Sequence, residues 1–180
     1  MKTKMIYLFA LIPLFAACSL IEDASTITIS TDLKADIPVV IVSPGAKSGD
    51  QTGGVNTIVF TKSQDLMLSG NADIEPYLDK IKEINLNSLV VTVTGLSEGQ
   101  TINSVALDVT GVGNIFTQTN ITMTNNSFTP TITAATLDQV AAKLFSDRKI
   151  TLTLSGNASG PMTFTVGLNF DTDIVANVLE

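Results

Sequence analysis

Residues 101–110 read Thr-Ile-Asn-Ser-Val-Ala-Leu-Asp-Val-Thr, with the apolar residues Val105, Leu107 and Val109 at every second position. Successive side chains of a β-strand point to opposite faces, so this alternation places three apolar side chains on one face. The stretch therefore predicts a β-strand with one face in a hydrophobic core and the other face in water.

The same alternation recurs along most of the chain and predicts a domain built mainly of strands. Thr26-Ile27-Thr28-Ile29 and Thr151-Leu152-Thr153-Leu154 both place threonine, a good strand former, on the polar face. The other segments in which we expect strands are residues 33–42, 56–68, 86–96, 115–123, 128–133 and 162–170, with residues 171–179 extending the last strand past a kink. Pro38 cannot donate a hydrogen bond to a neighbouring strand, so its segment should lie at a sheet edge or be broken there. A bulge is expected near Ser63.

Two segments, residues 73–84 and 136–147, carry the spacing of amphipathic helices instead. Their apolar stripes would be Ile74, Tyr77, Leu78 and Ile81 in the first segment and Leu137, Val140, Ala141 and Leu144 in the second. We expect Asp73 to cap the first helix, and Thr136 with Gln139 to form a capping box at the second.

Strands joined by short turns, with two short helices, predict a mainly β fold, namely a β-sandwich-like domain whose helices cover an edge or an end. The alternative is an α+β sheet with both helices on one face. Residues 56–95 and 127–156 both follow the order strand, helix, strand, and either an internal duplication or independent helix insertions would explain this. The length after residue 25 fits a single β-rich domain over residues 26–180.

The first residues have the character of a leader. Lys2 and Lys4 precede an apolar run that ends with Leu14-Phe15-Ala16-Ala17-Cys18, and this run is too short to span a membrane as a helix. A positive start, a short apolar centre and small residues before a cleavage site are typical of a secretory signal peptide, here residues 1–17. A plain signal peptide cut near Ala17 or a buried N-terminal helix would be the alternatives.

Leu14-Phe15-Ala16-Ala17-Cys18 resembles the lipobox of bacterial lipoproteins, although leucine is usual where Phe15 stands. The resemblance covers the leader alone. It implies cleavage before Cys18 and lipidation of Cys18, with residues 18–25 as lipidated cysteine and tether. Glu22-Asp23 resembles an acidic signal that sends some Bacteroidetes-type lipoproteins to the outside of the outer membrane, and a solvated linker is the alternative interpretation. The resemblance implies a lipid-anchored protein of the bacterial cell envelope, with the outer membrane as its expected location.

Charge and composition restrict the partners and the chemistry. After residue 17 the chain carries 8 basic and 17 acidic residues, a formal charge of −9, which disfavours nucleic acid and leaves acyl chains on Cys18 as the membrane contact. The chain has no histidine, so Ser-His and Cys-His nucleophile pairs are impossible, and zinc loses its favoured ligands. Asp171 and Asp173 would share a strand face, but no calcium loop accompanies them, and solvated carboxylates are expected. We predict no catalytic residues, no metal and no cofactor.

Three functions remain open. The first is a non-catalytic, lipid-anchored envelope protein that binds an envelope protein partner or serves a structural role. The second is a binding module or carrier for an apolar ligand, which would need a cavity lined by residues such as Leu66, Leu89, Phe116 and Phe164. The third is a hydrolase that uses two carboxylates about 5–9.5 Å apart in a cleft, for which the sequence nominates no pair.

Overall fold

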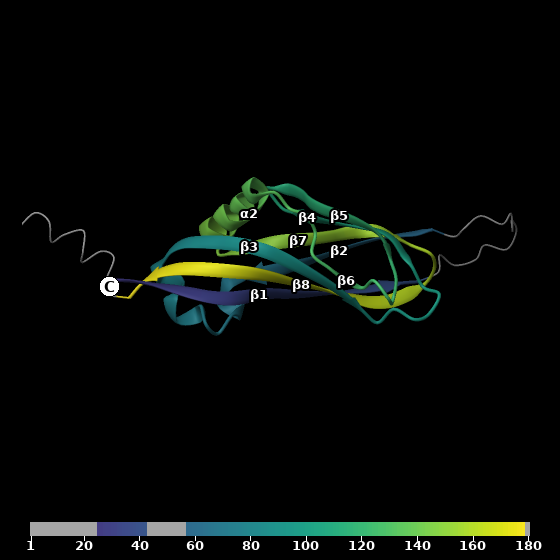
Figure 1. Ribbon diagram of the computed structural model, residues 1–180, viewed down its shortest axis with the longest axis horizontal. Coiled ribbons are helices and arrows are strands. Elements are labelled where there is room, and N and C mark those ends of the chain that lie inside the picture. The colour runs from purple at the N-terminus through teal and green to yellow at the C-terminus, as the bar shows by residue number, and fades with distance from the viewer. Residues whose placement is uncertain (1–24, 43–56, 179–180) are drawn as a thin grey trace, which may run out of the picture.

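The computed structural model describes residues 25–42 and 57–178 of the chain, and within them two antiparallel four-stranded sheets pack face to face (Figure 1). The β1 sheet has the order β1 (Thr26–Ile41), β8 (Met162–Asn177), β3 (Ile81–Thr94) and β6 (Ser127–Phe128). The β2 sheet has the order β2 (Ile58–Met67), β7 (Lys149–Ala158), β4 (Ile102–Val109) and β5 (Gly113–Ile121). The predicted mainly β, sandwich-like fold is confirmed, in place of a single sheet with both helices on one face.

The strand pairs are nested about the middle of the chain. β1 pairs with β8, β2 with β7, β3 with β6 and β4 with β5, and all four pairs are antiparallel. The first four strands therefore pair with the last four in reverse order, as in one long hairpin. The β3–β8 and β4–β7 pairs complete the two sheets. Eight strands in two sheets with this nested pairing form a jelly roll.

The alternation seen in the sequence explains which side chains form the core. Val105, Leu107 and Val109 of β4 are at most 1% exposed, as their spacing predicts. Between the sheets, the rings of Phe60 and Phe164 pack edge to face with their centroids 5.5 Å apart. This filled interior holds the two sheets together through apolar burial.

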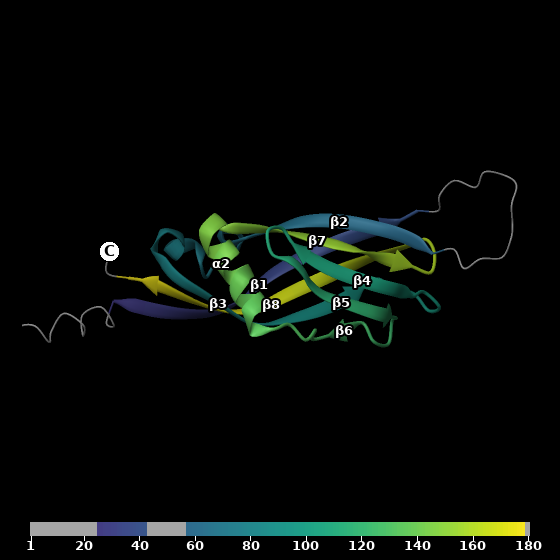
Figure 2. The ribbon, with the colours of Figure 1, turned by 90° about the horizontal axis from the view of Figure 1, so that it is seen from above.

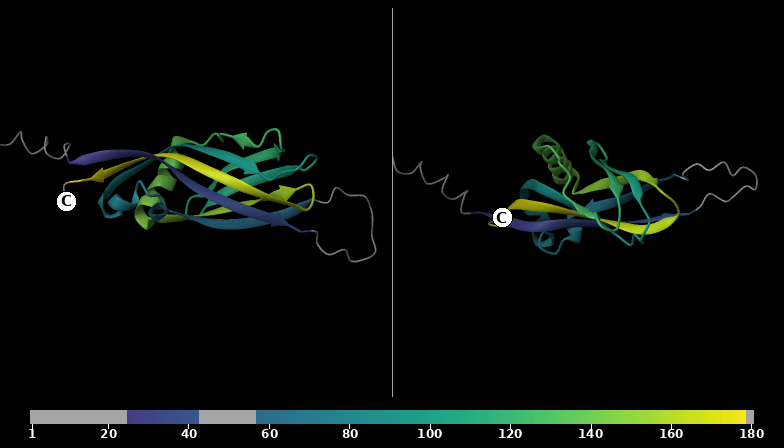
Figure 3. Two further views of the ribbon diagram at one scale, coloured as in Figure 1. Left: turned by 90° about the horizontal axis from the view of Figure 1, so that it is seen from below. Right: turned by 45° about the vertical axis from the view of Figure 1, so that its right-hand side comes forward.

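Both chain ends of the described domain lie at the same end of the elongated molecule, because Thr26 at the start of β1 pairs with Asn177 at the finish of β8 (Figure 3). We call this the Thr26 end. The turns at residues 95–101, 122–126 and 159–161 lie at the opposite end, which we call the turn end. No helix in residues 25–42 and 57–178 has the length and apolar character needed to cross a membrane.

One helix is confirmed. Helix α2 (Ala134–Asp147) buries the predicted stripe of Leu137, Val140, Ala141 and Leu144, and it packs against β3 and β7, one strand from each sheet. Its cap differs from the prediction, because the N-cap is Thr133, whose side chain accepts a hydrogen bond from the Thr136 backbone amide. Thr136 is therefore inside the first turn.

The other predicted helix, residues 73–84, is wrong. The chain instead forms short 3-10 helices at η1 (Leu68–Gly70) and η2 (Glu75–Lys80), and Ile81 already begins β3. Asp73 accordingly does not cap a helix, since the N-cap of η2 is Ile74 and makes no side-chain cap bond.

Several strand details also differ from the expectations. β2 pairs with β7 without a register shift, so no bulge occurs near Ser63. Thr26–Ile41 form one continuous strand, β1, and its Pro38 lies on an edge strand as predicted. β8 pairs with β1 in unbroken register as far as Asn177, so no kink interrupts that pairing. Of the strand expected over residues 128–133, only Phe128 is in a strand, and with Ser127 it forms β6.

The two segments compared as a repeat, residues 56–95 and 127–156, both join one sheet to the other. Their helices differ, because the first contains 3-10 turns and the second contains the long helix α2. They also cross in opposite directions, from the β2 sheet to the β1 sheet and back again. The nested topology alone is sufficient to produce this similarity.

Candidate functional site

The candidate site is a surface groove between the two edge strands β1 and β2, which lie side by side (Figure 2). Its cavity volume is about 540 Å³. Thr31 to Lys34 of β1 form one wall, Asp65 to Met67 of β2 form another, and the turn at residues 70–73 closes the third side.

Asn71 fixes that turn against β1. Its side-chain amide donates hydrogen bonds to Thr31 Oγ1 at 3.1 Å and to the Asp32 carbonyl at 3.0 Å. Its side-chain oxygen accepts from the Asp73 amide at 2.9 Å, and Thr31 Oγ1 donates to Asp73 Oδ2 at 3.0 Å. The Asp32 carbonyl belongs to an edge strand, so this contact satisfies an edge acceptor that would otherwise face water.

Ionic side chains line both strands of the groove. Thr151 Oγ1 donates a 2.7 Å hydrogen bond to Asp65 Oδ1, and Lys149 Nζ lies 3.6 Å from Asp65 Oδ2. These contacts hold the pKa of Asp65 below its usual value, with the Thr151 hydrogen bond as the larger cause. Lys34 Nζ lies 3.3 Å from Asp32 Oδ2, and both side chains are largely exposed, so this pair adds little stability.

The chemistry that the groove offers is polar recognition. A carboxyl with a lowered pKa stays ionised near neutral pH, so Asp65 accepts hydrogen bonds and does not donate a proton. Amide, hydroxyl and ammonium groups beside it supply donors. Within residues 25–42 and 57–178, no cluster of three or more acidic, cysteine or histidine side chains is arranged to hold a metal ion.

Asp171 and Asp173 do share the outer face of the β1 sheet, as predicted. Asp173 accepts hydrogen bonds from Ser30 and from Asn87 Nδ2, the latter at 2.9 Å, and the Ser30 bond is the main cause of its lowered pKa. The structure also pairs Asp171 with Asp32 across β8 and β1. That neighbour could not be found from spacing, because nothing local connects residues so far apart in sequence.

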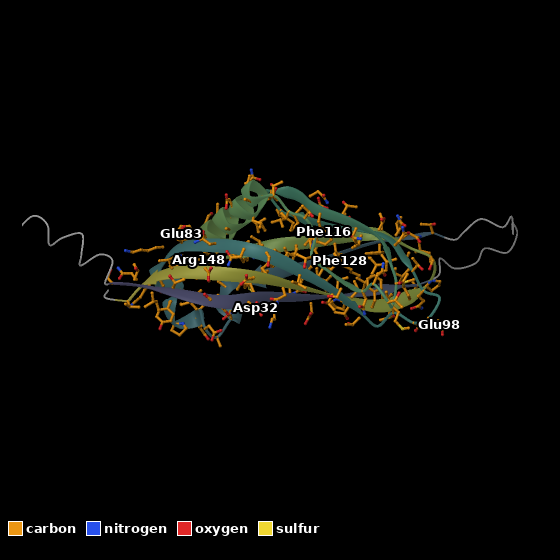
Figure 4. The ribbon with its side chains drawn as sticks, in the orientation of Figure 1. Asp32, Glu83, Glu98, Phe116, Phe128 and Arg148 are labelled. Atoms are coloured by element: carbon orange, nitrogen blue, oxygen red, sulfur yellow. The ribbon has the colours of Figure 1, made fainter. Side chains whose placement is uncertain are left out.

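The four side chains proposed to line an apolar cavity lie in the hydrophobic core instead. Leu66, Leu89, Phe116 and Phe164 are at most 6% exposed. Phe116 packs edge to face against Phe128 of β6, with ring centroids 5.9 Å apart, and Figure 4 shows both rings. Well-packed rings at these positions give no support to a ligand cavity between the sheets.

The predicted leader, Cys18 and the Glu22-Asp23 pair lie outside the described residues. Sequence reasoning missed the groove, because Asn71 and Asp65 come from segments that only the fold brings to β1. The one available signal was Asn71 in the expected turn Ser69-Gly70-Asn71-Ala72, since asparagine in a turn often bonds to nearby backbone.

Comparisons with known proteins do not identify a family for this chain. No protein-family model matches the chain, and no curated protein does. Among solved structures, a chain of Desmodium yellow mottle tymovirus is similar at 10% identity, with 86% of this chain and 91% of that chain covered and a TM-score of 0.31. A likeness at this level supports no inference about function.

Proposed function

We propose that this chain is a lipid-anchored protein of the bacterial cell envelope, held at the outer membrane, with a non-catalytic binding or structural role. The observation that carries the proposal is the sequence Leu14-Phe15-Ala16-Ala17-Cys18, which places the only cysteine after two small residues at the finish of an apolar leader. Two or three acyl chains on Cys18 would make attachment stable, whereas one chain binds only marginally.

The arrangement of the domain is compatible with such an anchor. Residues 19–25 separate Cys18 from Thr26, the first residue of β1, and an extended tether of this length reaches about 25 Å. The tether would enter at the Thr26 end, so the turn end would face away from the membrane. A partner in the envelope would then meet the turn end or the sides of the sandwich first.

The charge supports the acyl chains as the membrane contact. The chain has 17 acidic and 10 basic residues, and two of the basic residues lie in the leader. Anionic lipid headgroups repel such a protein. Membrane binding would therefore depend on the acyl chains and not on electrostatic attraction to the lipid headgroups.

Intact-mass analysis of the protein from membranes tests the proposal, with Cys18→Ser as the variant and Ser19→Ala as the matched control. We expect a chain that begins at Cys18 and carries the mass of two or three acyl groups. Cys18→Ser should lose the acyl mass and leave the membrane fraction, while Ser19→Ala should keep both. An unmodified chain in the soluble fraction would overturn the proposal.

A further inference from the structure

The edge strand β5 differs from the other sheet edges. β1 and β2 each carry charged side chains, and β1 also contains Pro38; such residues are the usual means of preventing an edge strand from pairing with another chain. β6 is too short to offer an edge. β5 reads Gly-Asn-Ile-Phe-Thr-Gln-Thr-Asn-Ile over nine residues and has neither a charge nor a proline.

The absence of charge extends beyond the strand. Residues 109–137 contain no charged side chain in a protein that is acidic overall, and they include β5, β6 and the connection to α2. In a two-fold dimer, residues near the axis meet their own copies, so an acidic surface would place like charges together. The β5 side avoids this repulsion.

The hydrogen bonds of β4 indicate which residues of β5 face the open edge. The Thr110 amide donates to the Thr151 carbonyl of β7 at 3.1 Å, and backbone groups of alternate residues point to the same side of a strand, so those of Leu107 and Val105 point to β5. Val105 lies opposite Gln118, so the backbone groups of Gln118 bond to β4 and those of Thr117 and Thr119 face the open edge. The side chains of Thr117 and Thr119 are both exposed.

We propose that β5 pairs antiparallel with β5 of a second copy of this chain, centred on Gln118. The sequence Thr117-Gln118-Thr119 reads the same in both directions, so each Gln118 meets its copy and each Thr117 meets the other copy's Thr119. Cross-strand threonine pairs are favourable, and the pairing joins two four-stranded sheets into one continuous sheet. The contact is short, because Asn120 has a left-handed backbone conformation (φ 56°) that interrupts the regular strand geometry.

Such a short contact gives a weak dimer that depends on local concentration. Antiparallel pairing points the two Thr26 ends in opposite directions. If the proposed anchor is correct, the pair therefore joins copies held on two facing membranes. The pairing itself does not rest on the anchor, and its test uses unlipidated protein.

Thiol cross-linking of the full chain with Cys18→Ser tests the register, because each added cysteine is then the only thiol. Directly opposed residues of an antiparallel pair have Cα atoms about 4.5 to 5.5 Å apart, within disulfide reach. Gln118→Cys should form disulfide dimers. An equal mixture of Thr117→Cys and Thr119→Cys should cross-link several-fold more than either variant alone. Gln64→Cys, exposed on edge strand β2, is the matched control and should stay monomeric.

A charge variant gives an independent measurement by sedimentation across protein concentration. Thr117→Lys should abolish the concentration-dependent dimer and leave the melting temperature unchanged, because its side chain is exposed. The proposal is overturned if the protein with the native β5 sequence stays monomeric at every concentration and Gln118→Cys cross-links no more than Gln64→Cys. Equal cross-linking of the mixture and of the separate threonine variants would also contradict the antiparallel register.

Discussion

At Gly156 the backbone of β7 passes so close to β4 that a side chain has no room. A β-carbon there would lie 2.1 Å from the Ser104 carbonyl oxygen and 2.8 Å from Phe60 Cζ. Because backbone cannot move aside as a flexible side chain can, Gly156→Ala should lower the free energy of unfolding by about 3 kcal/mol. Urea denaturation measures this. Gly160→Ala is the control and should change stability by less than about 0.5 kcal/mol, since nothing lies near its β-carbon. Equal stability of the two variants would contradict the close approach.

The lowered pKa of Asp65 predicts how the stability that its contacts contribute changes with pH. Its pKa is lowered first by the Thr151 hydrogen bond and then by Lys149, against an opposing effect of burial. A carboxyl with a lower folded pKa contributes stability above its unfolded pKa of about 3.9 and loses it as the pH falls through the folded value. Acid should therefore weaken this contact only below about pH 4.

Replacement of Thr151 tests the largest of those causes. Thr151→Val keeps the branched shape and removes the donor, so the pKa of Asp65 should rise toward its usual value. Lys149→Met should also raise it. NMR titration of the Asp65 carboxyl carbon measures both shifts, and Thr153→Val, which removes only a contact with Ser63, should leave the titration unchanged. An unchanged Asp65 titration in Thr151→Val would contradict the role of this hydrogen bond.

The candidate groove shows what single residues can and cannot reveal. The shared strand face of Asp171 and Asp173 was predictable from their spacing in an alternating segment. The contact of Asn71 with Thr31 and Asp32 was not, because it joins residues about 40 apart through a turn whose path is set by the fold. Local patterns identify faces, and tertiary contacts decide which faces form a site.

At the scale of elements, the cap of α2 gives a direct prediction. Thr133 Oγ1 accepts from the Thr136 amide at 3.2 Å, so Thr133→Ala should cost about 1 kcal/mol of unfolding free energy. Thr136→Ala should cost less, because its hydroxyl contacts only the Thr133 hydroxyl at 2.9 Å. Thr131→Ala, exposed outside the helix, is the control for urea denaturation. If Thr136→Ala proved the more damaging change, the capping box expected from the sequence would be right.

The helix predicted over residues 73–84 rested on the spacing of Ile74, Tyr77, Leu78 and Ile81. Ile74 is the N-cap of the 3-10 helix η2, which contains Tyr77 and Leu78, and turns of three residues also place residues three apart on one side. β3 begins at Ile81, and the irregular pairing between Ile81 and Glu83 leaves the buried side chains Ile81 and Ile84 three apart as well. A 3-10 helix followed by a bulged strand therefore has the spacing used to recognise an α-helix.

At the scale of the whole molecule, alternation predicted most strands and the sandwich class, but not the strand order. The outermost pair joins Ser30 of β1 to Asp173 of β8, which are 143 residues apart. An alternating pattern indicates that a strand has one buried face, but it contains no information about which strand pairs with it. The nested pairing could therefore not be predicted from the sequence. For β1 the edge position was one of two predicted alternatives, because Pro38 implied either a sheet edge or a break in the strand.

That nested pairing should slow folding, because β1 can pair with β8 only after strands that are distant in the sequence have come together. A circular permutant tests this. The Val178 amide bonds to the Ser25 carbonyl at 2.7 Å, so a two-residue Asn-Gly turn can join residues 178 and 25. New ends between Glu98 and Gly99 would open an exposed turn. In this permutant β8 and β1 become a hairpin, and refolding followed by far-ultraviolet circular dichroism should be several-fold faster, with the native spectrum retained.

The matched control keeps the original chain order and inserts the same Asn-Gly pair between Glu98 and Gly99. It should refold at the rate of the parent chain, because β1 and β8 remain distant in its sequence. Equal refolding rates for the permutant and this control would show that closure of the β1–β8 pair does not limit folding. In that case the slow step would belong to pairs that the permutation leaves unchanged, β4 with β5 or β4 with β7, and the irregular registers of β4 in both pairs would become its most direct explanation.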